Sequence, residues 1–224
     1  MGNRAIVKPI NENIGVYLHW NGGVDSVTAF LEYCKLKGYR DFSGECADGY
    51  GIARFVQVVS NFFGGTTNIG IEMNVDETEE CASGLDNGIY VIDGWNIEKR
   101  IGNITDSEGY DLQEMLIDID KSQPKKEQLG EEFFKSEIVD VSEINIGDKV
   151  YLYDDIWSKY ERQTVLGIGY KDDIINGRNV ENIPFIDKYG EDNNVESYRN
   201  NPSNYLREDK VRRYSKAEEI IPKF

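Results

Sequence analysis

The sequence has little of the chemistry that most catalytic and metal sites use. It contains one histidine, His19, so a Ser-His-Asp triad would have to use that residue, and a histidine-rich metal site is not expected. The three cysteines, Cys34, Cys46 and Cys81, have the spacing of neither a zinc site nor a redox pair. We therefore expect no metal and no cofactor. No catalytic residue can be assigned, and the sequence favours a protein that is not an enzyme.

Long hydrophobic runs are also missing. No run approaches the roughly 20 apolar residues that a membrane-spanning helix needs, and the segment that begins at Met1 lacks a secretory signal pattern. We expect a cytoplasmic protein that does not contact membranes. Hydrophobic residues make up 39% of the chain and aromatic residues 12%, which is enough to form a packed core.

Negative charge is concentrated in the first half of the chain. Residues 1–120 contain 20 acidic and 8 basic side chains, a net charge of −12, whereas the remainder has 21 and 17, a net charge of −4. Such a surplus repels phosphate backbones and suits a basic protein surface, although it can also serve only to keep a protein soluble. The candidate acidic surface consists of Glu72, Asp76, Glu77, Glu79, Glu80 and Asp86.

Residues 1–124 have the pattern of an acidic α+β module with about three helices on a small antiparallel sheet. Apolar residues recur with helical spacing from Val27 to Cys34, and again in segments near Phe55 and Met115. Asp25 or Ser26 is expected to cap the first helix, and Asp111, three residues before Glu114, is expected to cap the third. Short strands are expected at 5–7, 16–18 and 69–73, followed by an acidic loop over 74–87 and a hairpin over 89–97 that turns at Asp93 and Gly94.

A charged linker is expected over 125–137, because this segment carries proline and glycine. Residues 138–224 have a mostly-β pattern with turn signals, such as Asn176-Gly177, between short strands. We expect a small β-barrel of SH3-like size. A basic strand over 210–214 could close it, either as an edge that resists aggregation or as a contact to nucleic acid. Nucleic-acid binding is expected only through this module.

One loop resembles a known phosphate-binding loop. A strand from Val16 to His19 runs into Trp20-Asn21-Gly22-Gly23-Val24-Asp25-Ser26 and then a helix. This arrangement is similar to the phosphate-binding loop of the ATP pyrophosphatases. Glycines and a helix N-terminus can hold a phosphate. In this sequence Asn21 replaces the leading serine of that family, and a polar segment follows where a buried parallel strand should be. A helix start without any ligand is the alternative.

The opening residues also resemble a family of proteins carried by phages, plasmids and integrative elements of Gram-positive bacteria. The likeness lies in Met1-Gly2-Asn3-Arg4-Ala5, in the block from Tyr17 to Gly23, and in similar strings as far as Pro124. The resemblance implies an accessory role in a bacterial host cell, of the anti-CRISPR or anti-restriction type. Together with the charge it leads us to expect a non-enzymatic inhibitor that presents an acidic surface to a basic partner, such as a defence nuclease.

Overall fold

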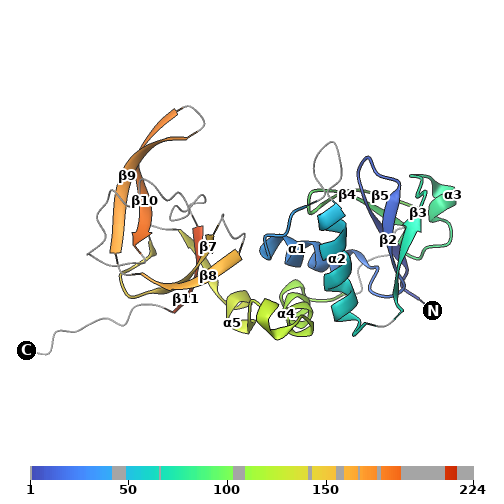
Figure 1. The fold of residues 1–224 in the computed structure, drawn as a ribbon, viewed down its shortest axis with the longest axis horizontal. Helices are drawn as coiled ribbons and strands as arrows, with labels where there is room; N and C mark the ends of the chain where they lie inside the picture. Colours follow the sequence, from blue (N-terminus) through green and yellow to red (C-terminus); the bar gives the residue numbers. More distant parts are fainter. Residues whose placement is uncertain are drawn as a thin grey trace, which may run out of the picture. The chain divides into compact units, whose positions relative to one another are not determined.

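The computed structural model describes residues 2–41, 49–65, 67–102, 109–140, 143–154, 159–165, 167–175, 178–187 and 210–215. The chain contains both helices and sheets and divides into two compact units, Met1–Gly130 and Glu131–Phe224 (Figure 1).

The first unit is built on a five-stranded sheet with the order β3-β2-β1-β4-β5. Its strands are β1 (Ala5–Pro9), β2 (Ile14–Leu18), β3 (Ile69–Met73), β4 (Ile89–Asp93) and β5 (Asn96–Ile101). All neighbours are antiparallel except β1 and β4, which run parallel. The prediction of a purely antiparallel sheet is therefore wrong for this pair. A parallel pair needs a long crossover, and the segment between the two strands supplies one.

Helices α1 (Val24–Leu36), α2 (Gly49–Phe62) and α4 (Leu112–Ser122) pack together, as the helical spacing predicted. The Phe30 ring of α1 lies edge-on to Phe55 and Phe62 of α2, with centroids 6.4 and 5.2 Å away. Paired residues of neighbouring strands share a face, so Val7, Val16 and Tyr90 lie on one side of the sheet. The Tyr90 hydroxyl donates to the carbonyl of Gly22, directly before α1, which ties this face to the helices.

The opposite face of the sheet is covered by the segment from Val75 to Leu85. Val75, Ala82 and Leu85 form one buried cluster with Ile6, Ile89 and Val91 of the sheet. This segment was expected to be an acidic loop throughout, but it contains one turn of helix, α3 (Glu79–Ala82). Thr78 begins it by accepting a hydrogen bond from the Cys81 amide. A single turn is too short to show a helical period in the sequence.

One turn and one helix start can be compared with the predictions. The hairpin of β4 and β5 turns at Gly94 and Trp95, one residue later than expected, because Asp93 pairs with Asn96 and Gly94 takes the positive φ of 58°. Helix α4 begins as predicted, with the Asp111 carboxylate accepting from the Glu114 amide.

The described strands of the second unit form two sheets. One has the order β6-β11-β7-β8 and the other is the antiparallel pair β9 and β10. The bounds are α5 (Glu131–Phe134), β6 (Glu137–Asp140), β7 (Lys149–Asp154), β8 (Lys159–Thr164), β9 (Gly167–Ile175), β10 (Arg178–Asp187) and β11 (Lys210–Ser215). Ile175 pairs with Arg178, so β9 and β10 are joined by the expected Asn176-Gly177, which lies outside the described residues.

The segment expected to be a linker carries a 3-10 turn, η1 (Lys125–Glu127), and then α5. Phe133 of α5 is fully buried, and its ring lies 5.1 Å from Tyr151 and 4.8 Å from Tyr160, centroid to centroid. The aromatic pair Phe133-Phe134 therefore anchors this segment in the core of the second unit.

Strand β11 is an inner strand of its sheet, between β6 and β7, so the interpretation of its basic residues as an exposed edge is wrong. Arg213 is buried. Its guanidinium donates to the Glu137 carboxylate at 2.9 Å and to the Glu143 carbonyl at 3.0 Å, and it lies 3.7 Å from the buried Asp148 carboxylate. These contacts compensate the burial of its charge, which an edge position would not require.

Candidate functional site

A long stretch of the first unit carries negative charge alone. Between residues 55 and 98 the sequence has eight acidic side chains and no lysine or arginine. This stretch forms the second half of α2, then β3, α3, β4 and the first half of β5, and it includes all six predicted acidic-surface residues. The run without basic residues is a sequence signal that a net-charge count over 120 residues does not show.

Glu77, one of the six, is held by two lysines from the sheet. Its Oε1 accepts from Lys8 Nζ at 2.6 Å, and its Oε2 lies 2.6 Å from Lys99 Nζ. The Lys8 side chain is buried beneath it. Hydrogen bonds from Lys8 and Lys99 lower the pKa of the Glu77 carboxyl. Glu77 therefore neutralises a buried lysine and fixes the covering segment onto the sheet.

Asp86 is likewise bound within the unit. Arg4 donates to it from Nε at 2.8 Å, from Nη2 at 3.1 Å and from its backbone amide at 3.0 Å. These hydrogen bonds lower the pKa of the Asp86 carboxyl to about 2. A bidentate guanidinium-carboxylate pair of this kind holds both side chains in one geometry, which leaves Asp86 little capacity for a partner.

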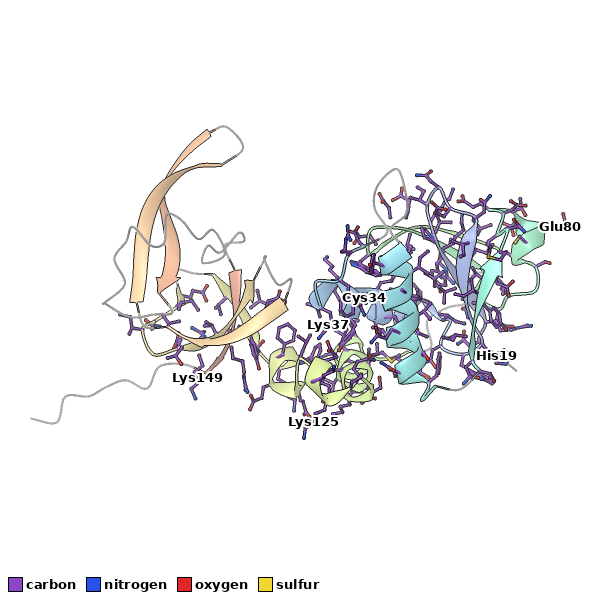
Figure 2. The ribbon with its side chains drawn as sticks, in the orientation of Figure 1. His19, Cys34, Lys37, Glu80, Lys125 and Lys149 are labelled. Carbon is purple, nitrogen blue, oxygen red and sulfur yellow. The ribbon has the colours of Figure 1, made fainter. Side chains whose placement is uncertain are left out.

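The other four carboxylates are exposed: Glu72, Asp76, Glu79 and Glu80. Within the described part of the chain, none of them has a hydrogen bond or an ion pair to its carboxylate. Glu72 pairs with Gly15, and a Cβ on Gly15 would lie 3.4 Å from Val75, so Glu72 shares a face with the covering segment that carries the others. Figure 2 shows Glu80 on α3, at the surface of the first unit. We call these four residues the acidic rim.

The predicted phosphate loop is packed tightly against β1. The Gly22 amide donates to the Asn3 carbonyl at 2.9 Å. A Cβ at this position would lie 2.5 Å from that carbonyl oxygen and 2.8 Å from the Ala5 Cβ. Gly22 and Gly23 are both buried. The requirement for glycine at position 22 is therefore explained by close backbone packing.

The polar residues of this loop form hydrogen bonds within the first unit. Helix α1 starts at Val24 with Gly23 as its N-cap, so the prediction that Asp25 or Ser26 caps it is wrong by two or three residues. The Asp25 carboxylate instead accepts the amides of Ser26 at 2.9 Å and Tyr110 at 3.0 Å. Ser26 is fully buried, and its hydroxyl oxygen accepts from the Asn21 side chain at 3.3 Å.

His19 and Trp20 form a small aromatic group at the surface. Nδ1 of His19 is 2.9 Å from the Tyr17 hydroxyl, and its ring lies edge-on to Trp20, whose indole is exposed. Figure 2 shows His19 well separated from Cys34. The lone histidine and the buried thiol therefore do not form a pair that could perform nucleophilic catalysis.

Cys34 lies in the core of the helices, and burial raises the pKa of its thiol. Cys46 is outside the described residues. In the part of the chain that the structure describes, no three His, Cys, Asp or Glu side chains converge in a way that could hold a metal ion. None of the helices in that part is both long and apolar enough to span a membrane.

Comparisons of the chain with protein-family models, with curated proteins and with solved structures found no match in any of the three.

Proposed function

We propose that this chain is a non-enzymatic binding protein of a mobile genetic element, which uses the acidic rim to bind a basic protein surface. The observation that carries the proposal is the contrast among the six predicted carboxylates. Two are engaged by lysine or arginine within the unit, and four are exposed and free of such partners among the described residues. Unpaired surface carboxylates on one side of a unit attract a basic partner and orient it during approach.

The partner class follows from charge and from the family resemblance. A nuclease that grips a phosphate backbone exposes lysine and arginine, and carboxylates can occupy those side chains in place of DNA or RNA. We therefore propose a counter-defence role of the anti-CRISPR or anti-restriction type in the cytoplasm of a bacterial host. The acidic surface inhibits such a partner by occupying its phosphate-binding groups, and no chemistry on the chain is needed.

The test compares two variants that each lose four carboxylates from the same unit. The rim variant carries Glu72→Gln, Asp76→Asn, Glu79→Gln and Glu80→Gln. The matched control carries Asp93→Asn, Glu98→Gln, Glu114→Gln and Asp118→Asn, all at exposed positions. Binding to purified defence nucleases is measured at about 50 mM and about 500 mM salt, since screening weakens surface charge pairs over this range.

We expect salt-sensitive binding that the rim variant loses and the control retains. Equal loss in both variants would mean that only net charge matters, and the rim would then have no special role. If none of the nucleases binds at low salt, the proposed function is wrong.

We also propose that the second unit closes as a small SH3-like β-barrel. Its support is a run of strands from β6 to β11 whose described pairings are all antiparallel. Nucleic-acid contact through this unit is the corresponding alternative function. Arg213 contacts Glu137 and Asp148 inside the unit, so this basic residue would not be part of a nucleic-acid-binding surface.

The alternative of a nucleotide-binding, ATP-pyrophosphatase-like enzyme has weaker support. The Gly22 amide, which would have to reach a phosphate, already donates to Asn3, and both Asp25 oxygens accept backbone amides. A melting shift with ATP and magnesium that is lost in Asp25→Ala would favour the enzyme instead.

A further inference from the structure

Strand β3 lies at one edge of the five-stranded sheet, so half of the backbone amides and carbonyls of β3 point away from the sheet. The His19 amide donates to the Asn68 carbonyl at 2.8 Å, which identifies this as a hydrogen-bonded pair. Such pairs alternate along antiparallel strands, so Gly70 and Glu72 bond to β2. The amides and carbonyls of Ile69, Ile71 and Met73 therefore face outward. No strand in the described part of the chain pairs with them.

The side chains along this edge are unusually apolar for an unprotected strand. Ile71 is 49% exposed and Met73 is 66% exposed. Edge strands are normally protected by lysine, proline or inward charges. The opposite edge, β5, follows that rule with Glu98, Lys99 and Arg100, whereas β3 carries Glu72 as its only charged residue.

From this geometry we propose that β3 is a docking edge, to which an extended segment of the partner adds as a sixth strand. The addition uses the outward amides and carbonyls of β3 for main-chain hydrogen bonds. The inference rests on the proposed function and names how the partner is bound. It assigns Ile71 and Met73, which were not among the sequence candidates, to the contact surface.

Charge determines which segment fits. On one face of the added strand, apolar side chains cover Ile71 and Met73, which lie on the same face as Val16. On the other face, a lysine or arginine side chain approaches Glu72, the acidic-rim residue that lies on β3 itself. The occupant is therefore an extended segment in which apolar and basic residues alternate, because successive side chains of a strand point to opposite faces.

The length of this segment is limited by the end of β3. Asn74 has a positive φ of 58°, and the following amide, of Val75, donates to Asn13. The regular ladder thus stops at Met73. The usable edge is about five residues, or roughly 17 Å, which is a common strand length.

A second copy of this chain fits the edge less well. Pairing β3 with β3 would bring two Glu72 side chains close together, and like charges near each other across strands are destabilising. The net charge of −12 over residues 1–120 adds to that repulsion.

The experiment uses the full chain and a seven-residue peptide that alternates lysine and valine. A second peptide of the same sequence has N-methyl groups on alternate amides, which removes donors from one edge and leaves the charge unchanged. The first protein variant replaces Ile71 and Met73 with asparagine. Its control replaces Leu112 and Ile146, which have similar exposure at 46% and 64%, with asparagine.

We expect the unmodified peptide to bind at low salt and the N-methylated peptide to bind about tenfold more weakly or worse, since two or three hydrogen bonds are lost. The β3 variant should lose binding and the control should keep it. Melting curves of each variant confirm that it is folded.

The outcomes separate the two proposals. If both peptides bind equally and with salt sensitivity, the acidic rim acts without the edge, so the docking edge is wrong while the proposed function stands. Dimerisation of the full chain that the β3 variant abolishes would assign the edge to a second copy. Absence of binding by either peptide, with salt-sensitive nuclease binding intact, would also overturn the docking edge.

Discussion

The Tyr33 hydroxyl donates a 2.8 Å hydrogen bond to Oδ1 of Asp120 and so joins α1 to α4. The same carboxylate accepts the amides of Leu129 at 2.8 Å and Gly130 at 2.9 Å. Both side chains are buried, and burial raises the pKa of the Tyr33 phenol. Asp120 is therefore a structural residue. Its carboxylate accepts all three of these hydrogen bonds and so fixes the segment that follows α4.

Replacing Asp120 with alanine leaves these donors without an acceptor in a buried site. We expect the free energy of unfolding to fall by about 2–4 kcal/mol, measured by urea denaturation. Asp118→Ala is the control on the same helix, where the side chain is exposed, and it should change stability by less than about 0.5 kcal/mol. Equal effects of the two substitutions would contradict the structural role of Asp120.

Gly22→Ala tests the packing of the loop before α1. The added methyl group would meet the Asn3 carbonyl oxygen and Ala5, so we expect a loss of about 1–3 kcal/mol in urea denaturation. At Gly84 an added Cβ has no neighbouring atom within 4 Å, and Gly84→Ala should be nearly neutral. A neutral Gly22→Ala would mean that the loop is free to move, and phosphate binding would regain support.

The ion pair of Arg4 and Asp86 should make the stability of the folded protein depend on pH in the acidic range. The pKa of Asp86 is about 2 in the folded protein, against an ordinary value of 3.8. The stabilisation of the folded protein by the charged Asp86 carboxylate is therefore complete at pH values above the ordinary pKa of 3.8. It is lost as the pH falls through about 2. The melting temperature of the wild type should exceed that of Asp86→Asn at neutral pH, and the gap should close between about pH 4 and about pH 2.

Asp76→Asn is the comparison for this experiment, because Asp76 has no partner for its carboxylate among the described residues. Its melting temperature should follow that of the wild type across the same pH range. A gap between wild type and Asp86→Asn that does not change with pH would show that Arg4 does not stabilise the charged carboxylate.

Cys34 should resist alkylation in the folded protein, because burial both blocks access and raises the pKa of its thiol. Treatment with iodoacetamide at about pH 8, followed by peptide mass spectrometry, should show Cys34 modified only after denaturation. Cys81, which is half-buried on α3, should react faster in the native state. Similar rates at the two cysteines would contradict the packing of α1.

Local features of the fold could be predicted from the sequence, and the features that depend on distant residues could not. Helical spacing identified α1, α2 and α4, and the Asp111 cap followed from its spacing to Glu114. The parallel pairing of β1 with β4 has no local signal, because either direction suits the same apolar strand. The inner position of β11 was missed for the same reason, and its basic residues were read as an edge.

For the candidate site, too, the sequence predicted the local features and missed those that depend on distant residues. The sequence identified the acidic stretch, but it could not distinguish Glu77 and Asp86 from the acidic rim, since their partners Lys8 and Arg4 are more than 65 positions away. The exposure of Ile71 and Met73 was equally hidden, because a buried inner strand and an apolar outer strand have the same composition.

The central position of β1 has a consequence for synthesis. Ile6 pairs with Ile89, so a ribosome must add 83 residues before this strand gains its second neighbour. At about 5–20 residues per second this takes about 4–17 s. During that interval a nascent chain can pair β1 with β2 alone and leaves its other side open. A translational pause ahead of Ile92 would prolong this state. A polypeptide released at that stage would expose one unpaired edge of β1, which is prone to aggregation and accessible to chaperones and proteases.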